Sequence, residues 1–214
     1  MSTNPHQFDK WRRHPWHGLS AGKNPPRELT AFIEITPFDS VKYEIDKPSG
    51  YLRVDRPNRT SSLPPMLYGF VPRTYCGTRV ATFSPNTAEG DGDPLDICVL
   101  SERMIARAEV LLDVHVIGGF RTLDSGSADD KIIAVLAQDA VWGDVEDINE
   151  IPERIIERLR HYFATYKIRP GHPSPVTVEA VYGAETAHRI VEASILDYQE
   201  YFGIGQVAAD EEGG

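Results

Sequence analysis

Between residues 29 and 136 the chain consists of short runs rich in β-branched and aromatic residues, which Pro, Gly, Asn and Asp interrupt repeatedly. Short runs bounded by turn residues are typical of a small all-β barrel or sandwich, and they exclude long helices from this half of the chain. Examples of the runs that we predict to be strands are residues 31–35, 41–45, 51–54, 96–100, 109–117 and 131–136.

Two helical patterns follow the strands. Pro152 suits the first turn of a helix, and apolar residues recur at helical spacing from Ile155 to Tyr166. A second apolar stripe runs from Ile190 to Tyr198, and Gly203 is a suitable end for that helix. Strands first and helices afterwards predict an α+β fold in which two C-terminal helices pack against the β-structure.

The chain has 214 residues, enough for one substantial core, and no Ser/Gly-rich or proline-rich linker divides it. We therefore expect a single domain at residues 31–204, an N-terminal arm at residues 1–30 and an acidic, disordered tail at residues 205–214. Trp11 and Trp16 lie in the arm. We expect the arm to pack as an irregular strap on its own domain or on a neighbouring subunit.

The net charge of −10 and the pI near 5.1 argue against nucleic acid or an anionic membrane as the main partner, because either needs a basic face. Cys76 and Cys98 are too few for a disulfide framework. The first thirty residues contain no apolar run of the kind found in signal peptides or membrane spans. A cytoplasmic protein is expected.

Asp91, Asp93 and Asp96 lie within six residues and lead directly into the apolar run 97–100. Three nearby anions repel one another unless a cation neutralises them, and carboxylates without His or Cys suit Mg²⁺, Mn²⁺ or Ca²⁺. A solvated turn is the alternative interpretation of the same residues. An EF-hand is excluded, because Leu95 and Asp96 occupy its fifth and sixth positions and a strand follows.

The segment 41–46 alternates, so that Lys42 and Glu44 share one face of a predicted hairpin. An ordinary exposed hairpin face would look the same. An ideal four-residue loop pairs Glu44 with Arg53, which directs Arg56 to the opposite face unless a bulge intervenes. The sequence pattern leaves the direction of Arg56 open.

A second acidic group, which includes Asp124 and Asp129, is predicted to lie in a loop before the strand that begins at Lys131. Tyr166 and Lys167 end the first helix, where a lysine also complements the helix dipole. The sequence contains no Walker phosphate loop, no Gly-x-Ser-x-Gly elbow and no His-Glu-x-x-His motif. Nucleophilic serine chemistry therefore has no support in the sequence.

From about residue 32 to residue 198 the chain resembles the soluble, Mg²⁺-dependent inorganic pyrophosphatases called family I. The segment 91–96 with the apolar strand after it is the most specific part of the resemblance. The residues that match the family in chain order are Glu34, Lys42, Glu44, Arg56, Tyr68, Asp91, Asp93, Asp96, Asp124, Asp129, Lys131, Tyr166 and Lys167.

The resemblance implies a five-stranded OB-like β-barrel with additional hairpin strands, assembled into a homo-oligomer that hydrolyses pyrophosphate with several Mg²⁺ ions, for which Mn²⁺ or other divalent ions can substitute. Asp93 matches the carboxylate with which the family deprotonates the attacking water. The implied metal ligands are Asp91, Asp96, Asp124 and Asp129, supported by Glu34 and Glu44. The implied phosphate-binding side chains are Lys42, Arg56, Tyr68, Lys131, Tyr166 and Lys167.

Two features depart from the family pattern. Pro64 stands where the family usually has a tyrosine, and an asparagine is missing nearby, so the family's hydrogen bonds around the leaving phosphate or the water-activating carboxylate are not carried over to this chain. The segment 168–175 differs in length and lacks a lysine that some relatives have.

Two other functions stay open on the sequence alone. One is a non-catalytic OB-type module that binds metal or an oligomeric ligand, and the other is a metal-dependent hydrolase of nucleotides or polyphosphate. A binding module normally presents aromatic and basic stacking faces, whereas the predicted open face here is acidic.

Overall fold

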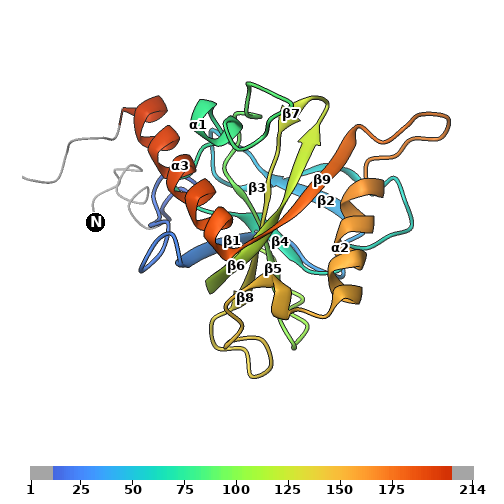
Figure 1. Cartoon of the computed structure of the whole chain (residues 1–214), viewed down its shortest axis with the longest axis horizontal. Helices are drawn as coiled ribbons and strands as arrows, with labels where there is room; N and C mark the ends of the chain where they lie inside the picture. The colour runs from blue at the N-terminus through green and yellow to red at the C-terminus, as the bar shows by residue number, and fades with distance from the viewer. Residues whose placement is uncertain (1–11, 204–214) are drawn as a thin grey trace, which may run out of the picture.

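The computed structural model describes residues 12–203 (Figure 1). Trp11 and the acidic segment 205–214 lie outside the described residues. The prediction that this segment is disordered therefore concerns residues that the structure does not describe. The elements are β1 (Glu28–Ile35), β2 (Val41–Ile45), β3 (Leu52–Pro57), β4 (Leu67–Phe70), α1 (Thr78–Ala81), β5 (Asp96–Leu100), β6 (Val110–Asp124), β7 (Ser127–Ala128), β8 (Lys131–Leu136), the 3₁₀ helix η2 (Ile148–Glu150), α2 (Glu153–Thr165), β9 (Val176–Gly183) and α3 (Ala184–Phe202).

A mixed seven-stranded sheet forms the centre of the fold. Its strands follow the order β1-β4-β5-β8-β6-β7, β9 pairs with β6, and β1 pairs with β6 as well as with β4. The pairing of β5 with β8 is parallel, and β2 and β3 form a separate antiparallel hairpin. The sheet and the helices confirm the predicted α+β class.

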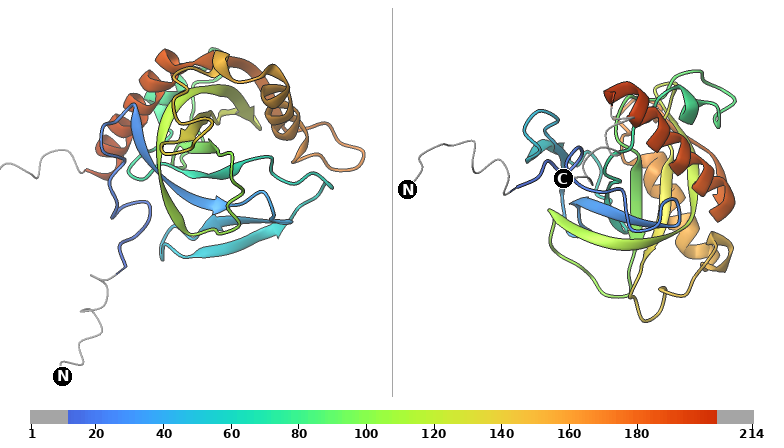
Figure 2. Two further views of the ribbon diagram at one scale, coloured as in Figure 1. Left: turned by 90° about the horizontal axis from the view of Figure 1, so that it is seen from below. Right: turned by 90° about the vertical axis from the view of Figure 1, so that its left-hand side faces the viewer.

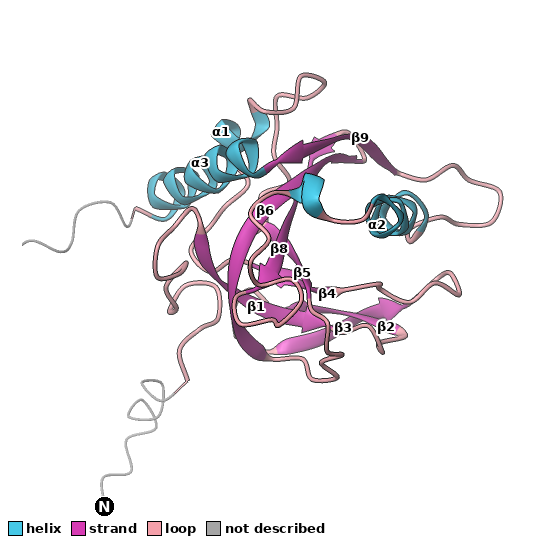
Figure 3. Ribbon diagram, turned by 60° about the horizontal axis from the view of Figure 1, so that its bottom comes forward, coloured by secondary structure: helices cyan, strands magenta, loops and turns pink. Residues whose placement is uncertain are grey.

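The helices cover the sheet as their apolar stripes predict. α2 begins directly after Pro152, and α3 ends at Gly203, whose φ of 66° is the left-handed conformation that favours glycine at a helix end. Both helices lie against β6 and β9, and the β2–β3 hairpin lies on another side of the sheet (Figures 2 and 3). In the described part of the chain, no helix is long and apolar enough to span a bilayer.

Alternate residues of the central strands enter two different parts of the core. Ile132 of β8 packs in a cluster with Ile190 of α3, whereas its neighbour Ile133 packs in a cluster with Leu159 and Phe163 of α2. This alternation is the period-two pattern of a strand that is buried on both faces. The parallel register of β5 and β8 places Asp96 and Lys131, the first residues of the two strands, beside each other.

One prediction of strand extent was wrong, because β6 continues to Asp124 instead of ending at residue 117. Asp124 is therefore the last residue of a strand and does not lie in a loop. The strands β4 and β9 were not among the runs named from the sequence. Gly119 interrupts the β-pattern of β6, but a Cβ there would come within 2.5 Å of the Tyr182 ring, so the close approach of β9 requires the glycine.

The described part of the N-terminal arm packs on its own chain. The Trp16 side chain is 3% exposed, its Nε1 donates a hydrogen bond to the Thr74 carbonyl oxygen at 2.8 Å, and its ring contacts Phe202 edge-on. These contacts hold the arm beside α3 (Figure 2). The Trp16 side chain is thus a buried anchor within the subunit.

Candidate active site

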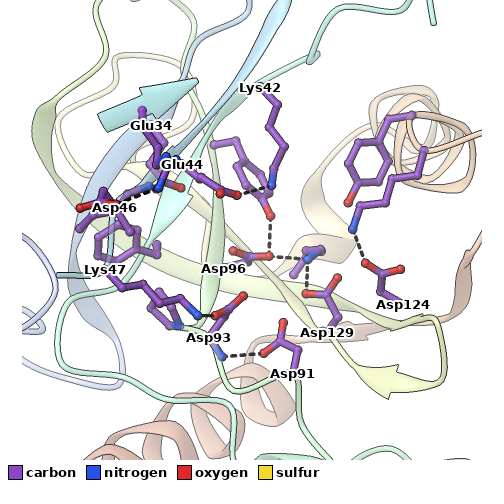
Figure 4. Close-up of a pocket in the computed structure, with 18 of the residues that line it drawn as sticks. Glu34, Lys42, Glu44, Asp46, Lys47, Asp91, Asp93, Asp96, Asp124 and Asp129 are labelled. Atoms are coloured by element: carbon purple, nitrogen blue, oxygen red, sulfur yellow. Dashed lines mark hydrogen bonds and ion pairs between the residues drawn. The ribbon is translucent and has the colours of Figure 1, made fainter. Parts of the chain in front are cut away.

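A cavity of about 470 Å³ collects the predicted acidic and basic residues at one side of the sheet (Figure 4). Of the predicted site residues, Arg56 alone does not line it. The lining includes Glu34, Lys42, Glu44, Tyr68, Asp91, Asp93, Asp96, Asp124, Asp129, Lys131, Tyr166 and Lys167, together with Asp46, Lys47 and Arg53.

The segment 91–96 forms a turn that presents its carboxylates to the cavity. Gly92 adopts a φ of 75°, and Asp91 Oδ1 accepts a hydrogen bond from the Asp93 backbone N–H at 3.0 Å. Two backbone hydrogen bonds to Cys76, of 2.8 and 3.1 Å, tie this turn to the buried core. Burial, reinforced by Asp129 and Asp96, raises the pKa of Asp91 to about 8.

Asp96, Asp129 and Lys131 form a buried ionic group. The parallel register places Asp96, the first residue of β5, beside Lys131, the first residue of β8. The Lys131 ammonium, 1% exposed, donates to both carboxylates, and the Tyr68 hydroxyl donates to Asp96. Burial alone would lower the pKa of Lys131, but Asp129 and Asp96 outweigh it and raise that pKa.

Glu34 and Lys42 lie at the junction of β1 with the β2–β3 hairpin. Glu34 is buried, and its Oε1 accepts a hydrogen bond from the Ile45 backbone N–H at 2.6 Å. Burial, with Asp96 as the next cause, raises the pKa of Glu34 to about 8. The Lys42 ammonium lies 3.0 Å from Glu44 and 3.1 Å from Asp55.

The Asp93 side chain is 47% exposed and forms an ion pair with Lys47 (Figure 4). Sequence reasoning missed Lys47, which lies in the four-residue loop of the predicted hairpin. It also missed the ion pair of 3.0 Å between Asp46 and Arg53 across the hairpin. The position of Lys47 directly after the alternating charged strand could have indicated a site residue. The sequence pattern did not indicate that its side chain contacts Asp93.

Asp124 and Lys167 close another side of the cavity. Lys167 follows the C-terminal cap of α2 at Tyr166, and its ammonium pairs with the Asp124 carboxylate. Burial alone would raise the pKa of Asp124, but the hydrogen bond and the charge of Lys167, together with Ser125 and Lys131, lower it. The last turn of α2 and the end of β6 thereby bring the second acidic group to the cavity.

A β-bulge settles the direction of Arg56. Glu44 pairs with Arg53 as predicted, but the register then shifts between Lys42 and Tyr43, so that Arg56 pairs with Lys42. The Arg56 guanidinium forms an ion pair with Asp55 and lines two smaller cavities beside the main one. The bulge therefore brings Arg56 to the border of the site.

Pro64 is buried beside Arg56 and Tyr68 at a small void of about 20 Å³. Tyr162 of α2, another residue that sequence reasoning missed, lines the same void. Burial raises the pKa of the Tyr162 hydroxyl, and the positive charge of Arg56 opposes this shift. A phenol from α2 thus lies next to the proline that replaces the expected tyrosine.

The donor set of the cavity suits a hard divalent cation. Asp91, Asp96 and Asp129 offer only carboxylate oxygens, and burial and mutual repulsion raise the pKa values of Asp91 and Asp129, a cost that a dication relieves. Within residues 12–203, no three His, Cys, Asp or Glu side chains converge closely enough to surround one ion. The Lys131 ammonium lies between Asp96 and Asp129 instead.

The comparisons with known proteins find inorganic pyrophosphatases. An inorganic pyrophosphatase from Chlamydia trachomatis is 44% identical over 199 residues, which cover 88% of this chain and 95% of the relative. A soluble inorganic pyrophosphatase of Chlamydomonas reinhardtii is 36% identical, with coverages of 88% and 90%. The crystal structure of the Thermus thermophilus inorganic pyrophosphatase superposes with a TM-score of 0.74 at 29% identity, covering 88% of this chain and 99% of that one.

The family model described as inorganic pyrophosphatase matches residues 31–199, a range that contains all of the predicted site residues. Members of this family are metal-dependent hydrolases, in keeping with the carboxylates of the cavity. The chain belongs to the inorganic pyrophosphatase family.

Proposed function

We propose that this chain hydrolyses inorganic pyrophosphate to two phosphates. The observation that carries the proposal is the single cavity in which buried carboxylates face the ammonium groups of Lys42, Lys131 and Lys167. Carboxylates alone would repel a polyanion, and lysines alone would not activate water. Together they suit a substrate that enters with divalent cations.

Mg²⁺ is the cation that we propose, held by Asp91, Asp96, Asp124 and Asp129, with Glu34 and Glu44 behind these ligands. The all-oxygen donor set supports this choice, and Mn²⁺ is the expected substitute. When bound, Mg²⁺ lowers the pKa of water and neutralises charge on the phosphates.

Asp93 is the general base in this proposal, as the family resemblance implies, and its half-exposed carboxylate reaches the cavity. The water oxygen bonds to one phosphorus, the bond from that phosphorus to the bridging oxygen breaks, and Asp93 accepts a proton from the water. The phosphate oxygens are held by the side chains of Lys42, Arg56, Tyr68, Lys131, Tyr166 and Lys167.

We also propose that β1, β4, β5, β8 and β6 close into the OB-like barrel, which the pairing of β1 with both β4 and β6 supports. Residues 31–204 would then be one domain with residues 1–30 as its arm. A cytoplasmic location is proposed because both cysteines are unpaired and buried, as is usual in a reducing compartment.

Replacement of single carboxylates tests this division of roles. Asp93→Asn should bind Mg²⁺ normally and lose roughly 10² to 10⁴-fold in pyrophosphate hydrolysis, because Asn cannot accept the proton. Raising the pH should restore some turnover, since hydroxide is then more abundant. The matched variant Asp91→Asn should instead weaken Mg²⁺ binding in a calorimetric titration, and excess Mg²⁺ should restore part of its activity. Full rescue of Asp93→Asn by Mg²⁺ at neutral pH would make Asp93 a metal ligand and contradict its assignment as the base.

A further inference from the structure

The described part of the N-terminal arm contains a tight turn at residues 14–18, which we call the arm turn. The Gly18 backbone N–H donates to the His14 carbonyl oxygen at 2.7 Å and closes it. The His14 Nδ1 accepts hydrogen bonds from the backbone N–H groups of Trp16 and His17, at 3.2 and 3.3 Å. Because Nδ1 is an acceptor, the neutral His14 ring carries its proton on Nε2 and donates from that atom.

One side of the arm turn contacts the loop between β2 and β3, which carries Lys47. The His14 Nε2 donates to the Lys47 carbonyl oxygen at 2.9 Å. Gly50, at the end of the same loop, adopts a φ of 73°, and a Cβ there would come within 2.8 Å of Pro15 and 2.9 Å of His14. The loop therefore packs closely on the arm turn, and the hydrogen bond from His14 restrains the backbone at Lys47.

The other side of the arm turn contacts the segment before α1. The Trp16 Nε1 donates to the Thr74 carbonyl oxygen at 2.8 Å. The Thr74 Oγ1 accepts a hydrogen bond from the Leu95 backbone N–H at 2.9 Å. In the same segment, the Cys76 backbone N–H donates to the Asp93 carbonyl oxygen at 2.8 Å. The segment that anchors Trp16 therefore also anchors the turn that carries Asp93.

The Lys47 side chain connects the two sides (Figure 4). Its ammonium forms an ion pair with Asp93 Oδ1 and lies 5.9 Å from the centre of the Trp16 ring, within the range of a cation–π attraction. Exposed ion pairs usually contribute little, because the order imposed on two flexible side chains offsets their attraction. The arm turn contacts the supports of both partners here, so less freedom is lost when Lys47 and Asp93 pair.

We propose that the arm turn positions Lys47, and that Lys47 in turn orients the Asp93 carboxylate for its reaction with water. This inference deepens the proposed function and rests on the role of Asp93 in it. The ion pair engages Oδ1, so Oδ2 is the carboxylate oxygen that accepts the proton from the attacking water. Lys47 and His14 are positioning residues, because they act on the reaction through Asp93. Their loss should slow the chemical step and leave the binding of pyrophosphate intact.

Kinetics of Lys47→Gln with saturating Mg²⁺ test the first step. The kcat for pyrophosphate should fall roughly tenfold with an unchanged KM, because a small misplacement of a reacting group is costly. Lys47→Arg keeps the positive charge and should retain most of the turnover. Lys23→Gln is the matched control, because the Lys23 side chain is 74% exposed, pairs with Asp113 and does not line the catalytic cavity. A raised KM with an unchanged kcat in Lys47→Gln would make Lys47 a phosphate ligand and overturn the inference.

A double-mutant cycle with Asp93→Asn tests whether Lys47 acts through Asp93. The double variant K47Q/D93N should be no more than about twofold slower than D93N alone, since the carboxylate that Lys47 orients is already absent. If the two losses multiply instead, Lys47 acts independently of Asp93 and the inference is wrong.

His14→Ala tests the contribution of the arm turn. This variant removes the hydrogen bond to the Lys47 carbonyl oxygen, so kcat should fall several-fold with an unchanged KM, and the loss should not add to that of Lys47→Gln. Arg13→Ala, which replaces an exposed neighbour in the arm, is the control and should match the wild type. An equal loss in Arg13→Ala, or a loss in His14→Ala that multiplies with that of Lys47→Gln, would contradict the role of the arm turn.

The failure of this inference differs from the failure of the proposed function. A wild-type protein that hydrolyses pyrophosphate, together with an unchanged or increased kcat in Lys47→Gln, would overturn the inference alone. A wild-type protein that releases no phosphate from pyrophosphate would overturn the proposed function, whatever the variants do.

Discussion

At the scale of single residues, Glu34 ties the stability of the protein to pH. Its carboxyl group keeps its proton in the folded chain up to a pKa of about 8, whereas the ordinary value is 4.5. Between these values the folded state binds one more proton than the unfolded state at this position. The contribution of Glu34 to the free energy of unfolding is therefore fully present below about pH 4.5 and decreases as the pH rises toward 8.

Glu34→Gln should flatten this dependence in the metal-free protein, because Gln keeps an acceptor for the Ile45 N–H but does not titrate. One proton contributes a slope of at most about 1.4 kcal/mol per pH unit. Urea unfolding in EDTA between about pH 5 and pH 8 measures the slope, with Glu157→Gln on the exposed face of α2 as the control. Part of the slope should persist, because the pKa values of Asp91 and Asp130 are also raised. Identical slopes in the wild type and in Glu34→Gln would refute the role assigned to Glu34.

Residue-scale prediction succeeded where the signal was local. The spacing of Asp91, Asp93 and Asp96 was visible in six consecutive residues, and the structure places all three at one cavity. Arg56 could not be placed, because one bulge in β2–β3 reverses its direction and no residue pattern announces that bulge. Lys47 was missed for a related reason: its partner Asp93 lies 46 residues away along the chain.

At the scale of elements, the helices were the easiest to predict, because Pro152 and Gly203 mark a beginning and an end and the apolar stripes between them are long. β4 has four residues, too few to establish a period. β9 shows little alternation in burial, and α2 and α3 contact it through different core clusters. Tertiary packing, which the local pattern does not contain, decides such strands.

A carboxylate of α3 connects these elements to the active site. Asp197 is buried and accepts hydrogen bonds of 3.1 Å from the backbone N–H groups of Gly77, Arg79 and Val80 at the start of α1. The preceding residue, Cys76, is hydrogen-bonded to the turn that carries Asp91 and Asp93. The position of the carboxylate turn therefore depends on α3.

Asp197→Ala should lower the free energy of unfolding by about 3 kcal/mol or more, because several buried N–H groups lose a charged acceptor. Asp197→Asn keeps one acceptor oxygen and should lose less. Glu200→Ala is the control, since the Glu200 side chain is 67% exposed and its ion pair with Arg79 contributes little. Chemical denaturation of the three variants measures the difference. A loss in Asp197→Ala no larger than that in Glu200→Ala would show that α1 does not depend on this contact.

At the scale of the whole molecule, an acidic chain needs divalent cations to bind a polyanion. The net charge is −10, and the catalytic cavity is lined by eight carboxylates and five Lys or Arg side chains. Bound divalent cations would reverse the sign of this charge, whereas the smaller cavity beside it, which Arg56 and Lys167 border, is lined mainly by Arg and Lys. Composition predicted the sign of the whole chain and could not predict how the charges are distributed between the two cavities.

Assembly into a homo-oligomer is a second expectation at this scale. Leu111 and Val141 expose about half of their surface or more, and Met104 exposes 67%. The Trp16 anchor offers no support for an oligomer, because it is buried within its own chain. Light scattering at micromolar concentration should give a multiple of 23.9 kDa. A single species with the mass of one chain would contradict this expectation.

The most direct test of the catalytic account is phosphate release by the purified protein from pyrophosphate and from ATP, measured side by side with Mg²⁺ and with EDTA. The cavity holds carboxylates for cations and lysines for phosphate groups, so pyrophosphate should be hydrolysed far faster than ATP, and EDTA should abolish turnover. Equal rates on ATP would identify a nucleotide hydrolase instead. Absence of phosphate release from pyrophosphate with every divalent cation would contradict the account.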